Sequence, residues 1–163
     1  MRTQTISLYT FEELPDTVKA KVIEGYRNGI DYTEYEHELD EGFASIEAFC
    51  EHFGVKVKEC SINAFSHAYI TTTAEQDNFR GIKLSSIDRD YMPTGYYLDC
   101  DLWETFHDDF KDTGNAKYAF ECALEAAINA IQQSCESYYE DDSIIARLEA
   151  NEYEFLECGE IYN

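Results

Sequence analysis

One segment of this 163-residue chain constrains the fold more than any other, the run from Ala116 to Tyr138. Apolar residues recur there every three or four positions, the spacing of an α-helix that buries one face. This stripe consists of Phe120, Ala123, Leu124, Ala127, Ile128, Ile131 and Cys135. We expect the helix to pack across a sheet, because so wide a stripe needs a partner element. The substitution Ile128→Asp, which puts an unpaired charge into the stripe, is then predicted to unfold the chain.

Shorter patterns of the same period predict four more helices. The first has two candidate starts. The segment from Thr10 to Glu13 has the spacing of a capping box, whereas Pro15 favours a later start because proline is tolerated best at the first helical position. This helix is expected to end at Asn28 and Gly29. The other three are expected at residues 33–53, 101–110 and 142–150.

The middle of the chain has the alternation and the β-branched and aromatic residues of strands. Strands are expected at residues 55–60, 64–73, 80–87 and 96–98, and a terminal strand or tight hairpin is expected to turn at Gly159. The order of helices, strands and helices again predicts an α+β fold. We expect a single acidic domain over residues 1–163, with an antiparallel sheet packed by several helices, including the long one near 116–138.

The charge balance is the other unusual feature, with 34 acidic and 12 basic residues and a net charge of −22. Such a chain is not a conventional nucleic-acid binder, because it cannot neutralise a run of phosphates. Seven of the twelve basic residues precede Gly81, so the C-terminal half is the expected acidic face. If the charge gathered on roughly one third of the surface, its density would match that of B-DNA.

No catalytic or metal-binding motif is present. The pair Asp99 and Asp101 would start a calcium loop, but Glu104 stands where that loop needs glycine. His37 would start a zinc-protease motif, but Glu41 replaces the second histidine. We therefore predict no catalytic residue, no metal and no cofactor. A pair of carboxylates assembled from distant positions stays open as an alternative.

The sequence also shows no targeting signal. The residues before Leu8 do not form an apolar signal region, and no stretch is apolar enough to cross a bilayer. The six cysteines are widely spread and include no C-x-x-C pair, so free thiols are expected. We predict a cytoplasmic protein with no membrane partner.

Three segments, Leu8 to Leu14, Ile62 to Ser66 and Ile145 to Tyr162, resemble a loose group of small acidic proteins from phages and prophages, most of them uncharacterised. The group usually continues its central segment with a glycine- and serine-rich run, where this chain has Ser66 to Ile70 instead. The resemblance implies a phage setting and, because the group has no known catalytic residue, transfers none to this chain.

These observations predict a phage-encoded inhibitor of a bacterial defence complex, of the anti-CRISPR or anti-restriction type. It would act as an acidic nucleic-acid mimic in the host cytoplasm, binding a basic nucleic-acid-binding protein or complex but no nucleic acid directly. The sequence leaves the oligomeric state open, with a homodimer as one alternative. The predicted partner-binding residues, with Trp103 as the anchor, are Asp99, Asp101, Trp103, Glu104, Asp108, Asp109, Asp112, Glu136, Glu140, Asp141 and Asp142.

Two other functions stay open. The chain could be an antitoxin-like or regulatory protein that binds a basic host protein outside a nucleic-acid channel. It could also be a small enzyme or a ligand-sequestering protein whose site is assembled from unmarked residues.

Overall fold

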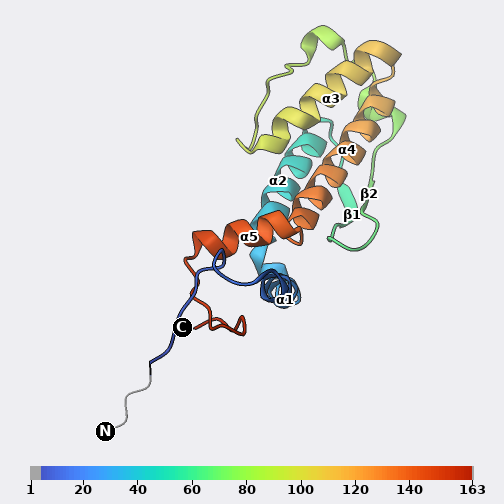
Figure 1. Ribbon diagram of the computed structural model, residues 1–163. Helices are drawn as coiled ribbons and strands as arrows, with labels where there is room; N and C mark the ends of the chain where they lie inside the picture. Colours follow the sequence, from blue (N-terminus) through green and yellow to red (C-terminus); the bar gives the residue numbers. More distant parts are fainter. Residues whose placement is uncertain (1–4, 163) are drawn as a thin grey trace. The chain divides into compact units, whose positions relative to one another are not determined.

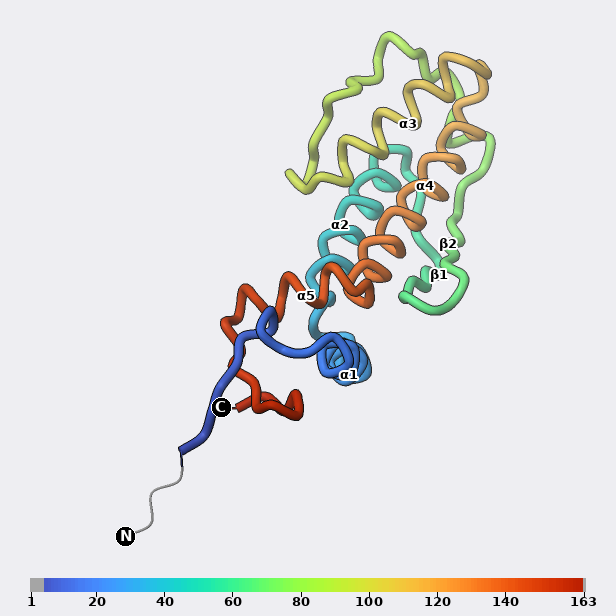
Figure 2. Tube along the Cα trace, viewed as in Figure 1, coloured from blue at the N-terminus to red at the C-terminus, as the bar shows by residue number. Residues whose placement is uncertain are grey.

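The computed structural model describes residues 5–162, so residues 1–4 and 163 of the predicted domain lie outside the described part (Figure 1, Figure 2). The fold is α+β, as predicted, with five α-helices and one two-stranded antiparallel sheet within the described range. The chain forms two compact units, which we call the central unit (residues 35–136) and the terminal unit (residues 1–34 and 137–163).

Three helices form the body of the central unit: α2 (Glu36–His52), α3 (Tyr97–Thr113) and α4 (Ala116–Ser137). α3 and α4 are joined by a short turn and run in opposite directions, as Figure 1 shows in yellow and orange. α2 and α4 approach closely at Gly42, where a Cβ atom would lie 2.5 Å from the Cδ1 atom of Ile131. Gly42 is therefore required by packing.

The core of the central unit is aromatic. The ring of Phe49 on α2 stacks on Phe120 of α4, with centroids 5.3 Å apart. It also meets Trp103 and Phe106 of α3 edge to face, at 4.9 and 5.9 Å. These four side chains are 0–1% exposed. Ile128 is buried as predicted, at 4% exposed, so the apolar stripe of α4 faces the core.

The sheet consists of β1 (Val57–Ser61) and β2 (Tyr69–Thr72), which pair antiparallel. The strand predictions at 80–87 and 96–98 are wrong. A 3₁₀ turn, Leu84–Ser86, lies in the first of these segments, and α3 begins at Tyr97 in the second. Local β-propensity is overridden there because Leu98 is fully buried at helical spacing with Leu102 and Phe106.

The terminal unit contains α1 (Asp16–Arg27) and α5 (Asp141–Ala150). Proline at position 15 precedes α1 directly, so the later of the two predicted starts is correct. The tail turns at Gly159, where φ is +92°, and the backbone N–H groups of Leu156 and Tyr162 donate to Glu160 and Glu154 at 2.8 Å. The predicted tight hairpin is therefore confirmed. The buried residues of this unit are Phe11, Leu14, Val22, Ile144, Leu148 and Phe155.

Candidate partner-binding surface

Five acidic residues of α3 form a continuous row, which we call the α3 stripe: Asp101, Glu104, Asp108, Asp109 and Asp112. They recur at a spacing that keeps them on one side of the helix. All are exposed except Asp109, which is half-buried. At a rise of 1.5 Å per residue the row is about 16 Å long, so its carboxylates follow one another about every 4 Å along the helix axis.

A shallow groove runs beside the stripe. It is lined by four of the stripe carboxylates, by Thr105, and by the small side chains of Ala126 and Ala130 on α4. Because alanine side chains are short, the carboxylates stand at the rim of this groove. A partner side chain entering the groove would meet negative charge from α3.

Most of the stripe is available to an outside partner. Arg89 pairs with Glu104 and lies 3.4 Å from Asp108, with all three side chains about half exposed. A hydrogen bond with His107, together with the positive charges of Arg89 and Lys111, lowers the pKa of Asp108, so this carboxylate is ionised at neutral pH. Among the described residues no ion pair involves the other three members, Asp101, Asp109 and Asp112.

Two of the predicted partner-binding residues are buried, and their prediction as surface contacts is wrong. Asp99 is 0% exposed, and its Oδ2 atom accepts hydrogen bonds from the backbone N–H groups of Thr94 and Gly95 and from the Thr94 hydroxyl, at 2.9–3.0 Å. Trp103 is 1% exposed and lies in the aromatic core. Asp99 therefore holds the segment before α3 by hydrogen bonds, and Trp103 packs in the core of the central unit.

The remaining predicted residues lie at the end of α4 and the start of α5. Glu136 is exposed in the central unit and accepts a hydrogen bond from Gln132 at 2.8 Å. Glu140, Asp141 and Asp142 belong to the terminal unit. Asp141 and Asp142 lie in the first turn of α5, where a negative charge interacts favourably with the helix dipole. Asp141 is paired with Arg27. Glu136 and Asp141 therefore have side-chain contacts within their own units.

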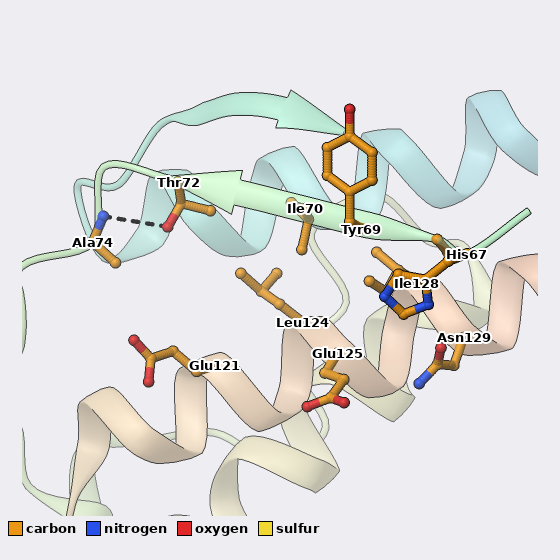
Figure 3. Close-up of a pocket in the computed structure, with 11 residues that line it drawn as sticks. His67, Tyr69, Ile70, Thr72, Ala74, Glu121, Leu124, Glu125, Ile128 and Asn129 are labelled. Carbon is orange, nitrogen blue, oxygen red and sulfur yellow. Dashed lines mark hydrogen bonds between the residues drawn. The ribbon is translucent and has the colours of Figure 1, made fainter. Parts of the chain in front are cut away.

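A second groove, which the sequence did not reveal, lies between β2 and α4 (Figure 3). Its apolar floor is formed by Ile70, Leu124 and Ile128, while Glu121 and Glu125 stand on the α4 side. The Glu121 carboxylate is 3.6 Å from the ammonium group of Lys117. No local motif could predict this groove, because its two walls come from segments about fifty residues apart in sequence.

The six cysteines are free thiols, as expected. Burial raises the pKa of Cys50 to about 12 and the pKa values of Cys60 and Cys135 to about 11. These three thiols are therefore protonated at neutral pH and are poor nucleophiles. Cys100 and Cys158 are exposed.

Within residues 5–162, no group of three or more histidine, cysteine, aspartate and glutamate side chains could hold a metal ion. No helix in the same range is long and apolar enough to cross a membrane. Comparisons with protein-family models, curated proteins and solved structures find no match to this chain. The resemblance to acidic phage proteins stays a prediction, and function must be inferred from surface chemistry.

Proposed function

We propose that this protein is a phage-encoded inhibitor of a bacterial defence complex, of the anti-CRISPR or anti-restriction type, and that it acts in the cytoplasm of the host. It blocks a basic DNA- or RNA-binding surface by imitating the charge of a nucleic acid. The α3 stripe carries this proposal. Its carboxylates follow one another about every 4 Å along the helix axis. This spacing is close to that of the phosphates in one strand of B-DNA, about 3.4 Å along the duplex axis.

The stripe suits the arginine and lysine side chains that normally bind phosphates. An exposed carboxylate accepts charge-assisted hydrogen bonds from a guanidinium group in the same way as a phosphate oxygen. The net charge of −22 favours fast association with a cationic channel, and salt weakens this attraction as it screens both partners. The residues proposed to contact the partner are therefore Asp101, Glu104, Asp108, Asp109 and Asp112, without Asp99 and Trp103.

A competition experiment tests the proposal. Purified RNA-guided effector complexes and restriction endonucleases are loaded with a fluorescent oligonucleotide, and this protein is titrated in while anisotropy is recorded. We expect release of the oligonucleotide from at least one complex, at a concentration that rises with salt. If the protein binds a complex while its nucleic acid stays bound, mimicry is wrong and a regulatory or antitoxin-like role is supported instead. If it binds none of them, the proposal is also overturned.

A further inference from the structure

The outer edge of β2 has no neighbouring strand. β1 covers the other edge, and within residues 5–162 no third strand joins the sheet. The backbone N–H of Thr73 donates to the carbonyl of Lys56 at 2.9 Å, so the backbone groups of Thr73 point toward β1. Because inward and outward residues alternate along an antiparallel strand, the N–H and C=O groups of Ile70 and Thr72 point away from β1. These four groups can pair with a further strand.

One side chain already binds this edge in the way that a strand would. The side-chain amide of Gln132, on α4, accepts from the backbone N–H of Ala68 at 3.3 Å and donates to the carbonyl of Ser66 at 3.0 Å. Ala68 precedes Ile70 by two residues, so its backbone N–H points to the same edge. Gln132 therefore closes the edge at Ala68 and leaves it open at Ile70 and Thr72.

The open part of the edge borders the groove between β2 and α4, which we call the β2–α4 groove (Figure 3). Its apolar floor lies below the strand, and the exposed side chains of Glu121 and Glu125 stand on the α4 side. Lys117 lies 3.6 Å from Glu121, and no described cation forms an ion pair with Glu125. The groove therefore combines an apolar surface with uncompensated negative charge.

The spacing of the two carboxylates matches the period of an extended chain. Glu121 and Glu125 are four residues apart on α4, which separates them by about 6 Å along the helix axis. Side chains on the same face of a strand are two residues apart, a distance of about 6.7 Å. Figure 3 shows the helix and the strand lying along each other, with Glu121 at the Thr72 end of the groove. A strand added to β2 would thus present two successive side chains to the two carboxylates.

We propose that the β2–α4 groove binds an extended basic segment of a partner protein, which joins the sheet as a third strand. The backbone of this segment pairs with Ile70 and Thr72, the mode of recognition in which main-chain hydrogen bonds supply affinity. Two lysine or arginine side chains, two residues apart, lay their aliphatic stems on the apolar floor and reach Glu121 and Glu125 with their charged ends.

The charge of the groove favours this occupant over a second copy of the chain. β2 (Tyr69–Thr72) has no basic residue, so pairing of two β2 edges would bring the carboxylates of both copies together without a cation between them. The groove shares no lining residue with the groove beside the α3 stripe. The inference goes beyond the proposed function and does not depend on it.

A designed peptide tests the proposal on the full chain. The probe is fluorescein-labelled Thr-Val-Lys-Val-Arg-Val-Thr, and its binding is followed by anisotropy. Two further peptides each carry one N-methyl group, on the arginine nitrogen or on the nitrogen of the valine before it. The protein variant is Glu121→Gln with Glu125→Gln. The matched control is Glu36→Gln with Asp40→Asn, which removes two exposed charges at the same spacing on α2.

We expect the unaltered chain to bind the probe and the groove variant to bind it at least about tenfold more weakly, the effect of losing charge-assisted hydrogen bonds. The α2 control should stay within about twofold. One methylated peptide should bind at least about tenfold more weakly and the other normally, because only alternate N–H groups of the added strand face β2.

Three results would overturn the proposal. The first is absence of binding by the unaltered chain. The second is equal weakening by the two protein variants or by the two methylated peptides, which would mean attraction by overall charge without strand pairing. The third is sedimentation of the chain as a dimer that the probe dissociates, which would assign the edge of β2 to a second copy.

Discussion

The two units of this molecule are stabilised by different means. The central unit has a core of interlocking aromatic rings from three helices, and most of its acidic side chains point outward. The terminal unit has a smaller core and depends on arginine. Arg147 donates to the carboxylate of Glu34 at 2.9 Å and to the backbone carbonyls of Tyr138 and Ser143, and its guanidinium lies over the ring of Tyr26.

Composition does not reveal this difference. The terminal unit has fourteen acidic and five basic residues, and the central unit has twenty and seven, so their ratios of acid to base are almost equal. The placement of the basic residues distinguishes them. In the terminal unit Arg27 pairs with Glu24 and Asp141, which stabilises that unit. In the central unit the α3 stripe is only partly compensated, because Arg89 and His107 contact just two of its five members, Glu104 and Asp108.

The largest expected effect comes from the core of the central unit. Ile128→Asp should unfold this unit, because an isolated carboxylate would replace a buried side chain, at a cost of several kcal/mol. Circular dichroism melting should show loss of the folded baseline. The control Ile128→Val, which only shortens the side chain, should cost about 1 kcal/mol. A normal melting curve for the aspartate variant would contradict the packing of α4.

A smaller effect is expected at the arginine of the terminal unit. Arg147→Met keeps the aliphatic stem but removes the side-chain donor to the Glu34 carboxylate and to the Tyr138 carbonyl, so we expect a loss of about 2–3 kcal/mol in chemical denaturation. The matched control is Arg80→Met, which breaks only the exposed pair with Asp77 and should cost less than about 0.5 kcal/mol. Equal losses would show that the arginine network does not stabilise its unit.

The buried thiols predict how stability depends on alkaline pH. The pKa of the Cys50 thiol is about 12 in the folded protein, whereas the ordinary value for cysteine, which applies to the unfolded chain, is 9.0. As the pH rises, the unfolded chain therefore loses this proton at a lower pH than the folded protein does. The free energy of unfolding should therefore fall from about pH 9 upward. Cys50→Ala should reduce this fall, whereas Cys158→Ala, which alters an exposed cysteine, should not. A parallel pH profile for Cys50→Ala and the unaltered protein would contradict this assignment.

The smallest effect on stability is expected at the α3 stripe. Reversal of Asp108 and Asp109 to lysine removes the contacts of Asp108 with Arg89 and His107 and the hydrogen bond of Asp109 with Cys122, and exposed ion pairs such as those of Asp108 contribute about 0–1 kcal/mol. The melting temperature should therefore change by only a few degrees. A collapse of stability would mean that the stripe has a structural role, and loss of binding by the variant could then not be assigned to the interface.

The helices were predictable because their apolar spacing is regular, and the α4 stripe is buried as its pattern indicates. The prediction that Trp103 lies at the surface is wrong, although its spacing from apolar residues of α3 indicates burial. It follows Leu102 and precedes Phe106 by three residues, which puts it on the buried side of α3. Its reading as an anchor relied on the neighbouring acids, which lie on the opposite, exposed side.

The two units could not be predicted. The terminal unit joins the two ends of the chain, for example through the backbone pairing of Tyr9 with Phe155, and no local pattern indicates which distant segments pair. Likewise, Asp99 belongs to a dense acidic run in sequence, but it is buried because Thr94 and Gly95 bring three donors to it. The sequence alone does not show that Thr94 and Gly95 donate to Asp99, because this depends on how the segment before α3 folds against the helix.

The most direct test of the account is the affinity of the partner complex for two matched variants that each change the net charge by the same amount. One reverses Asp108 and Asp109 to lysine on the α3 stripe, and the other reverses Glu47 and Glu51, exposed on α2. We predict at least about tenfold weaker binding and a flatter salt dependence for the stripe variant, and about twofold weaker binding for the α2 variant. Equal losses in the two variants would contradict the claim that the α3 stripe is the binding surface.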